Sequence, residues 1–208
     1  MSPPDRFETH LTVESGAMRH ADAIERFATE HGLKLVQIEL PRGAHPCQPM
    51  LSWRSEGALP ECLSSAAAMV QRLEAQGIRV VRTKIEASPF NADVPQGETP
   101  SAAGTYFESH VKLLLDAQAD QAELCDIAMA HGAHLSRNAR RVREDGRMER
   151  FVTLRRQMCG YAVIADDTAA LEAALAPRVE RILGTEIEYV VYDSNLTIDA
   201  GWLPEARG

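Results

Sequence analysis

Cysteine is scarce in this sequence, with four residues among 208. They form no Cys-x-x-Cys pair and do not have the spacing of a zinc site. Their positions are Cys47, Cys62, Cys125 and Cys159. Sparse cysteines of this kind are typical of reduced thiols, so we predict a cytoplasmic protein without a disulfide framework.

Long apolar runs are also missing. None approaches the roughly 20 residues that a membrane-spanning helix needs, and the first residues have no apolar stretch that would predict a signal peptide. The hydrophobic content of 45% is still enough to bury the core of one large domain or two small ones. We therefore expect a soluble protein with no membrane partner.

Positive charge is under-represented, and the formal net charge is −8. Proteins that bind nucleic acids broadly are usually basic, so a nucleic-acid partner is disfavoured. The sequence also lacks a GxGxxG, a GxxxxGK[ST] and a GxSxG motif. Nucleoside triphosphatase and serine hydrolase functions are therefore poor interpretations.

What the sequence does contain is an internal repeat with an offset of about one hundred residues. Three segments recur in the same order, the last after a slip of one residue. The matched pairs are Phe7-Glu8-Thr9-His10 with Phe107-Glu108-Ser109-His110, His31-Gly32 with His131-Gly132, and Met50-Leu51-Ser52-Trp53-Arg54 with Phe151-Val152-Thr153-Leu154-Arg155. The repeat predicts two copies of one structural unit.

Each copy has the same predicted order of elements, β-α-β-β-α-β. Alternating apolar and polar residues predict strands at 7–13, 35–40, 50–54 and 78–87, and again at 106–115, 133–141, 150–155 and 186–192. Helical spacing of apolar residues predicts helices at 20–31, 64–76, 120–131 and 167–183, with Gly32, Gly77 and Gly184 as helix ends and a kink at Pro177. The fold class is thus predicted as α+β, a tandem duplication of a ferredoxin-like βαββαβ unit with antiparallel sheets and helices on one face.

The predicted boundaries follow from this pattern. The first repeat covers residues 6–88, a linker rich in Pro, Gly, Ala and Ser covers 89–104, the second repeat covers 105–195, and a C-terminal tail covers 196–208. In the tail we expect Trp202 and Leu203 to fold back onto the body of the protein as an apolar contact.

The face of each sheet that the helices leave open carries a Glu-x-His pair. Strand alternation directs Phe7 to the side of the sheet that the helices cover. Glu8 and His10 therefore point to the open face, as do Glu108 and His110 in the second copy. Three interpretations stay open. The histidines act as general acid and base or contact a ligand, or all four side chains bind a divalent metal ion as cofactor, or the pairs are structural and orient one another between the repeats.

Hydroxyl and guanidinium groups accompany these pairs. Ser52 and Arg54 match Thr153 and Arg155 in the repeat, and by alternation each hydroxyl shares a face with its arginine. Arginine suits bidentate recognition of carboxylate or phosphate. Together with Arg137, from an arginine-rich segment of the second copy, they are the predicted ligand-binding residues for an anionic group.

The segment His10-Leu11-Thr12 resembles the HxT motif of the 2H phosphoesterase family, in which histidines of two lobes act as acid and base and the hydroxyl holds phosphate. The second copy departs from the motif, because Lys112 stands in the place of the hydroxyl. The first strand and helix also resemble a vicinal-oxygen-chelate module, although that family lacks a long second helix.

The function predicted from these features is a small-molecule enzyme or binding protein, with its pocket on the open sheet faces between the repeats and possible specificity for a phosphate- or carboxylate-bearing ligand. Two alternatives remain. One is a non-catalytic interaction protein in which self-association covers the open faces. The other is a divalent-metal protein that uses the Glu-x-His pairs.

Overall fold

The computed structural model describes residues 4–15, 21–98, 100–141 and 143–202. The first half contains β1 (Arg6–Val13), α1 (Ala21–Glu30), β2 (Lys34–Glu39), β3 (Cys47–Glu56), α2 (Leu59–Ala75) and β4 (Val80–Ala87). The second half contains β5 (Tyr106–Leu115), α3 (Gln121–Ala130), β6 (Ala133–Asn138), β7 (Met148–Gln157), α4 (Tyr161–Leu175) and β8 (Arg181–Asp193). Two short 3-10 helices, η2 (Ala176–Arg178) and η3 (Leu196–Asp199), flank β8.

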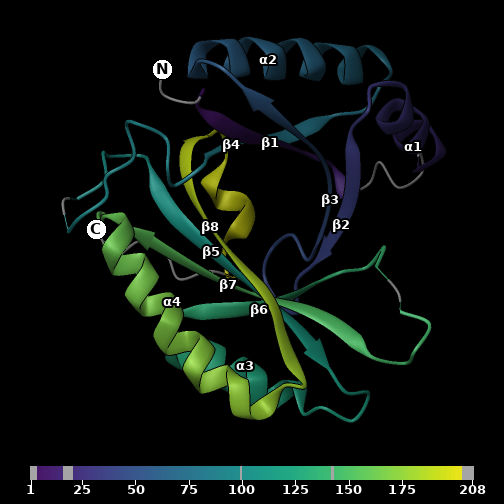
Figure 1. Ribbon diagram of the computed structural model, residues 1–208. Helices are drawn as coiled ribbons and strands as arrows, with labels where there is room; N and C mark the ends of the chain where they lie inside the picture. Colours follow the sequence, from purple (N-terminus) through teal and green to yellow (C-terminus); the bar gives the residue numbers. More distant parts are fainter. Residues whose placement is uncertain (1–3, 16–20, 99, 142, 203–208) are drawn as a thin grey trace.

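The strands of each half have the antiparallel order of a ferredoxin-like unit, which confirms the predicted fold class. The order is β4-β1-β3-β2 in the first half and β8-β5-β7-β6 in the second. The two sheets also pair with each other, through β2 with β6 and β4 with β8, so that all eight strands form one closed barrel. The open faces of the two predicted sheets therefore become the interior of a single barrel, and the four helices lie outside it (Figure 1).

Local sequence signals explain where the helices end. Gly32 and Gly132, the repeat-related glycines after α1 and α3, have φ angles of 66° and 69°. A side chain is strained in this left-handed region, and glycine is not, so the chain turns there from helix to strand. At the start of α3 the Asp120 carboxylate accepts hydrogen bonds from the backbone N–H groups of Ala122 and Glu123. This cap satisfies donors that have no partner within the helix.

The apolar core lies between the strands and the helices. Alternate residues of β1 and β5 are buried there, including Leu11, Phe107 and Val111, each 0% exposed. Phe27 of α1 and Leu171 of α4 contribute from the helical layer. The residues of β1 and β5 that alternate with these buried ones consequently face the barrel interior, as the alternation predicts.

The prediction for the segment 167–193 was partly wrong. Helix α4 begins at Tyr161 and ends at Leu175, and Gly184 lies within β8 instead of ending a helix. Pro177 falls in η2 and cannot donate the backbone hydrogen bond that would continue α4. The strand is longer than predicted because β8 pairs with β5 over its first part and with β4 over its last.

The start of the second helix was also placed too late. Helix α2 begins at Leu59, before the predicted residue 64. Pro60 occupies its first turn, and the Glu61 carboxylate accepts a hydrogen bond from the backbone N–H of Ala58 at 3.2 Å. Both features are favourable at a helix start.

The segments outside the two units pack against them. In the predicted linker, the Asn91 side chain both accepts a hydrogen bond from the backbone N–H of Arg6 and donates one to its carbonyl. In the tail, Trp202 is 7% exposed and packs against Leu40. The expected apolar contact thus forms through Trp202, while Leu203 lies outside the described residues. None of the helices in the described ranges is long and apolar enough to cross a membrane.

Candidate functional site

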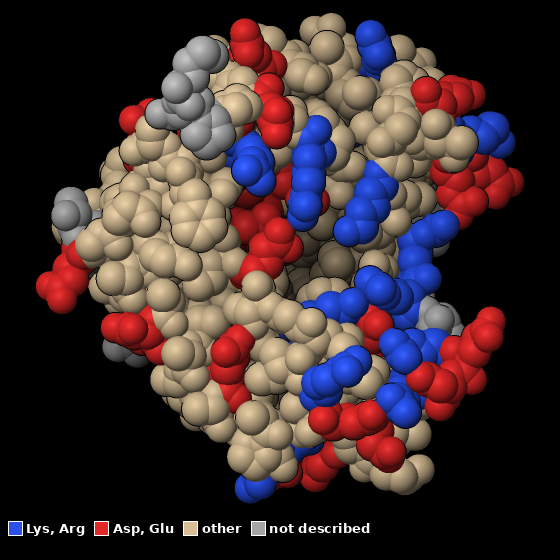
Figure 2. Space-filling view, viewed as in Figure 1, with Lys and Arg blue, Asp and Glu red and all other residues tan. Residues whose placement is uncertain are grey.

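The barrel encloses a cavity of about 230 Å³. At one end it adjoins a wider cleft of about 910 Å³, since Glu8, Glu86, Glu186 and Glu188 line both. Figure 2 shows a hollow in the surface, with Asp and Glu gathered at one side and Lys and Arg at the other. Charge is therefore unevenly distributed around this hollow.

All but one of the predicted site residues face each other in two cross-strand ladders. In the first, Glu8 and His10 of β1 stand opposite Arg54 and Ser52 of β3. In the second, Glu108 and His110 of β5 stand opposite Arg155 and Thr153 of β7. Of these predicted residues, six line the cavity, and they are Glu8, His10, Ser52, Glu108, His110 and Thr153. The periodicity of the repeat was therefore a sound guide to which side chains share the interior.

Arg137 is the exception. Its guanidinium lies 2.5 Å from the Glu39 carboxylate, where β6 meets β2, and its side chain is 52% exposed. The neighbouring residues Ser136 and Asn138 line the cavity, but Arg137 does not. Alternation along β6 explains this, because every second residue points away from the interior.

Arg155 belongs to a buried ion-pair network. Its guanidinium lies 2.6 Å from Glu108 and 2.7 Å from Asp199 of η3, and its side chain is 10% exposed. Arg82 of β4 pairs with Asp193 at 2.5 Å and with the same Asp199 at 3.1 Å. The C-terminal segment thus supplies a carboxylate that both arginines share.

Lys84 of β4 extends this network toward the first repeat. Its ammonium lies 2.6 Å from Glu108 and 2.5 Å from Glu86, and Glu86 lies 2.5 Å from the Nε2 atom of His10. Burial alone would raise the pKa of Glu108, but the charges of Lys84 and Arg155 outweigh it and hold that pKa well below its ordinary value. Lys84 and His10 likewise outweigh burial and lower the pKa of Glu86. Both carboxylates are therefore ionised and satisfied by neighbouring cations.

The two repeat-related histidines differ in their surroundings. His10 is bound to Glu86, whereas His110 accepts or donates a hydrogen bond at 3.0 Å to the Thr153 hydroxyl and has its Nε2 atom 3.7 Å from both Glu108 and Glu188. The His110 side chain is 28% exposed and that of His10 is 11% exposed. Of the two, His110 is the more accessible to a molecule in the cavity.

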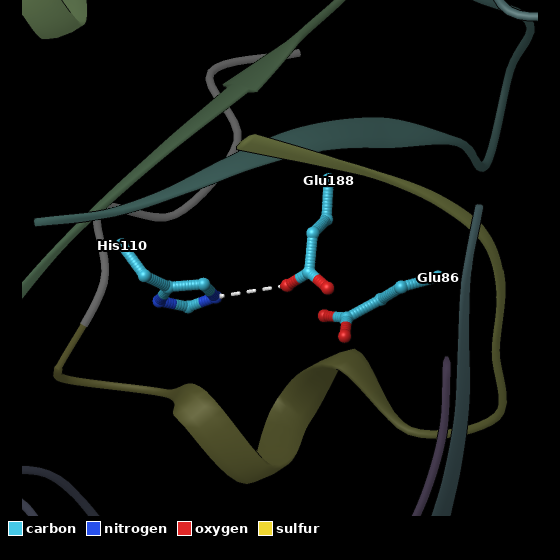
Figure 3. A group of neighbouring side chains, drawn as sticks. All are labelled: Glu86, His110 and Glu188. Atoms are coloured by element: carbon cyan, nitrogen blue, oxygen red, sulfur yellow. Dashed lines mark ion pairs between the residues drawn. The ribbon is translucent and has the colours of Figure 1, made fainter. Parts of the chain in front are cut away.

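Glu188 of β8 is the least satisfied carboxylate of this region. Its side chain is 13% exposed, and His110 is its one ion-pair contact in the part of the chain that the structure describes. Figure 3 shows its carboxylate between the imidazole of His110 and the carboxylate of Glu86, with all three side chains directed toward one another. Burial, and then the negative charges of Glu86 and Glu186, raise the pKa of Glu188 well above its ordinary value. Burial lowers the pKa of His110.

Two trios of side chains have the spacing of metal ligands. In each trio one oxygen or nitrogen atom per residue lies within 4.8 Å of the others: Glu86, His110 and Glu188, and separately Glu8, Glu186 and Glu188. His110 and Glu8 were among the predicted metal ligands. The other two predicted ligands are in ion pairs: His10 pairs with Glu86, and Glu108 pairs with Lys84 and Arg155.

The sequence prediction did not select several residues of the site. These are Arg82, Lys84, Glu86, Glu186, Glu188, Asp193 and Asp199. The alternation of Arg82, Lys84 and Glu86 along one strand was a usable signal. Alternation along β8 was also usable for Glu186 and Glu188, which stand opposite His110 and Glu108 of β5, but a bulge between Val190 and Tyr192 shifts the register, so Asp193 could not be placed in this way.

Comparison with known proteins yields only distant likenesses. No protein family model matches the sequence, and no curated protein matches it significantly. Among solved structures, a mutant chlorite dismutase from Candidatus Nitrospira defluvii is 14% identical, with 93% of this chain and 92% of that chain covered and a TM-score of 0.28. The small subunit of acetolactate synthase from Thermotoga maritima is 12% identical, with 90% and 98% covered and a TM-score of 0.29. Likeness of this degree carries no information on ligand or activity.

Proposed function

We propose that the barrel cavity binds a small molecule and that His110 and Glu188 hold it or exchange a proton with it. One observation carries the proposal. Among the buried and half-buried charged side chains described in the cavity, the others form close ion pairs, while His110 and Glu188 face each other at 3.7 Å without one. Ionisable groups that lack a close ion pair beside a cavity are available to a ligand.

The chemistry of the pair suits proton transfer. A lowered pKa keeps the His110 imidazole neutral near pH 7, so that it can accept a proton. A raised pKa keeps Glu188 protonated into a higher pH range, so that it can donate one. Two neighbouring groups whose surroundings shift their pKa values in opposite directions are a common feature of acid–base sites.

The arrangement of the arginines argues against an anionic ligand. Arg155 is paired with Glu108 and Asp199, and Arg54 with Glu8 at 2.7 Å and Glu186 at 3.1 Å. Neither guanidinium is left for a phosphate or carboxylate group. We therefore assign the two arginines to the architecture of the barrel.

The test uses the repeat-related histidines as matched variants. The purified protein is screened with a panel of cationic, neutral and anionic metabolites by thermal shift, and each hit is measured by calorimetry in His110→Asn and His10→Asn. We expect His110→Asn to abolish binding with little change in melting temperature. His10→Asn should lower the melting temperature, because it removes the imidazole that is paired to the buried carboxylate of Glu86. Unaltered affinity in both His110→Asn and Glu188→Gln would refute the proposal.

A divalent metal ion is the second candidate, supported by the trio of Glu86, His110 and Glu188. A carboxylate–histidine–carboxylate set of this kind suits zinc, manganese or iron. Elemental analysis of the purified protein and of Glu188→Gln tests it. Stoichiometric metal that is lost in the variant would support a metalloprotein, and its absence after incubation with these ions would exclude one.

A non-catalytic role is the third interpretation, and the surroundings of His10 support it for the first repeat alone. There the Nε2 atom of His10 is bound to the Glu86 carboxylate within the barrel. If His110→Asn and His10→Asn lowered stability equally and no compound were bound, this interpretation would replace the small-molecule site.

A further inference from the structure

The lining of the cavity includes a cluster of carboxylates and a group of apolar side chains, and this combination points to a class of ligand. Resting on the function proposed above, we infer that the ligand is a small organic cation, a primary amine with a short hydrocarbon body. Its ammonium group lies between Glu188 and His110, and its hydrocarbon part lies against the apolar wall of the barrel.

Carboxylates outnumber cations at the end of the cavity that adjoins the wider cleft. Glu8, Glu86, Glu186 and Glu188 line it, and carboxylate oxygens of Glu8, Glu186 and Glu188 lie within 4.8 Å of one another, as do those of Glu86 and Glu188. The cations beside them are Arg54, which bridges Glu8 and Glu186, and Lys84, which Glu86 shares with Glu108. Glu188 is left without a cation, and like charges at this distance disfavour its ionised form. A bound ammonium group would supply the missing positive charge.

Apolar side chains line another part of the same cavity. They are Val36 and Ile38 of β2, Leu40 directly after it, Met50 of β3, Phe151 of β7 and Trp202 of the C-terminal segment, and the polar residues Gln48, Ser136 and Asn138 stand opposite members of this group. A volume of about 230 Å³ lies below the roughly 300–1,000 Å³ of pockets for drug-sized ligands. The fitting ligand therefore has a few carbon atoms.

An ammonium group fits this end of the cavity better than a metal ion does. Glu86 is already paired with both His10 and Lys84, at 2.5 Å each, so a metal ion would have to displace one of these side chains. An ammonium group has three N–H donors and needs acceptors only. The Glu188 carboxylate and the neutral imidazole of His110 are such acceptors, and neither has to break an existing close contact.

Calorimetric titration with matched probes tests this inference. The probes are butylammonium, benzylammonium, butanol, butyrate and Mn²⁺, titrated into the full chain, His110→Asn, Glu188→Gln and Glu180→Gln. Glu180 is the control, because it pairs with Arg147 and does not line the cavity. We expect an amine to bind at least about tenfold more tightly than butanol, with a loss of about tenfold to a hundredfold in Glu188→Gln and no change in Glu180→Gln. Because Glu188 must ionise to pair with the amine, binding should also release protons, seen as a heat that depends on the buffer.

The possible failures separate the two proposals. If butanol or butyrate bound as tightly as the amine and lost affinity in His110→Asn, the ligand class would be wrong and the small-molecule site would stand. Stoichiometric binding of Mn²⁺ that Glu188→Gln abolished would replace the amine by a metal ion. If no probe bound at millimolar concentration, the inference on the ligand would be refuted. The wider metabolite screen, with His110→Asn as the variant, would then decide whether the proposed site binds a small molecule.

Discussion

Replacing Arg155 by methionine tests whether this residue is structural. The substitution keeps a long apolar side chain and removes the guanidinium. Two close ion pairs are lost, to Glu108 at 2.6 Å and to Asp199 at 2.7 Å, together with the stacking of the guanidinium 4.4 Å from the centre of the Tyr106 ring. Arg54 is the matched control, since it occupies the equivalent position of the first repeat and pairs with Glu8.

The two variants should differ strongly in stability because their burial differs. The Arg155 side chain is 10% exposed and that of Arg54 is 74% exposed. Removing one partner of a buried ion pair lowers the free energy of unfolding by about 3–5 kcal/mol, since the other partner is left as an uncompensated buried charge. An exposed pair contributes about 0–1 kcal/mol. For a chain of this length each kcal/mol lowers the melting temperature by about 2–4 °C, so we expect a fall of roughly 6–20 °C for Arg155→Met and at most about 4 °C for Arg54→Met.

Thermal unfolding followed by circular dichroism, with urea titration to obtain the free energy of unfolding, measures both variants. Asp199→Asn, alone and combined with Arg155→Met, extends the test. Because the two residues are in contact, the effects should combine with a coupling of about 0.5–3 kcal/mol. Equal loss of stability in Arg155→Met and Arg54→Met, or unchanged stability with lost ligand binding in Arg155→Met, would refute a structural role for Arg155.

The remaining predictions concern pH and the tail. Burial, and then the nearby charge of Arg42, lower the pKa of His134 to about 4, against about 6.5 in the unfolded chain, so the free energy of unfolding should fall as the pH drops from about 6.5 to about 4. Urea titrations across this range should give a shallower fall in His134→Gln, and an identical pH dependence would contradict the assignment. For Glu188 the folded-state pKa is raised, so its contribution to stability is full below the unfolded value and is lost as the pH rises through the folded value. The free energy of unfolding of Glu188→Gln, relative to that of the parent chain, should therefore be higher at pH 8 than at pH 4. A difference that does not change with pH would argue against the raised pKa. Trp202→Ala should lower the free energy of unfolding by about 3–5 kcal/mol, because Trp202 is buried against Leu40, and a loss under 1 kcal/mol would show that the tail does not stabilise the barrel.

Much of the architecture could be read from local patterns. The period-2 alternation around Glu8 and Glu108 identified the first strand of each unit and the side chains on its inner face. The matching positions of Arg54 and Arg155 identified the opposing strand. These inferences succeed because the direction of a side chain in a strand depends on the adjacent backbone alone.

The ends of elements and the edge strands were less accessible. Alternation does not say which strand lies beside β5, so Glu186 and Glu188 were not recognised as the residues opposite His110 and Glu108, and the bulge after Val190 further obscures Asp193. Asp199 lies in a short helix of the tail, and no pattern near it predicts contact with Arg82 or Arg155. Contacts of this kind depend on pairing between segments that are distant in the sequence.

The sequence by itself determined two βαββαβ units and the Glu-x-His pairs on the sheet faces that the helices leave open. Only the tertiary structure decided that the two sheets close into one barrel and that the repeat-related histidines differ. His10 lies beside Lys84 in the sheet and His110 beside Glu186, so the same motif meets opposite charges. Within the first sheet β4 places Glu86 at His10, and within the second sheet β8 places Glu188 at His110. Closure of the barrel adds the contact of Lys84 with Glu108, and the two histidines differ because the energy of a buried charge depends on all the charges around it and not on its own strand.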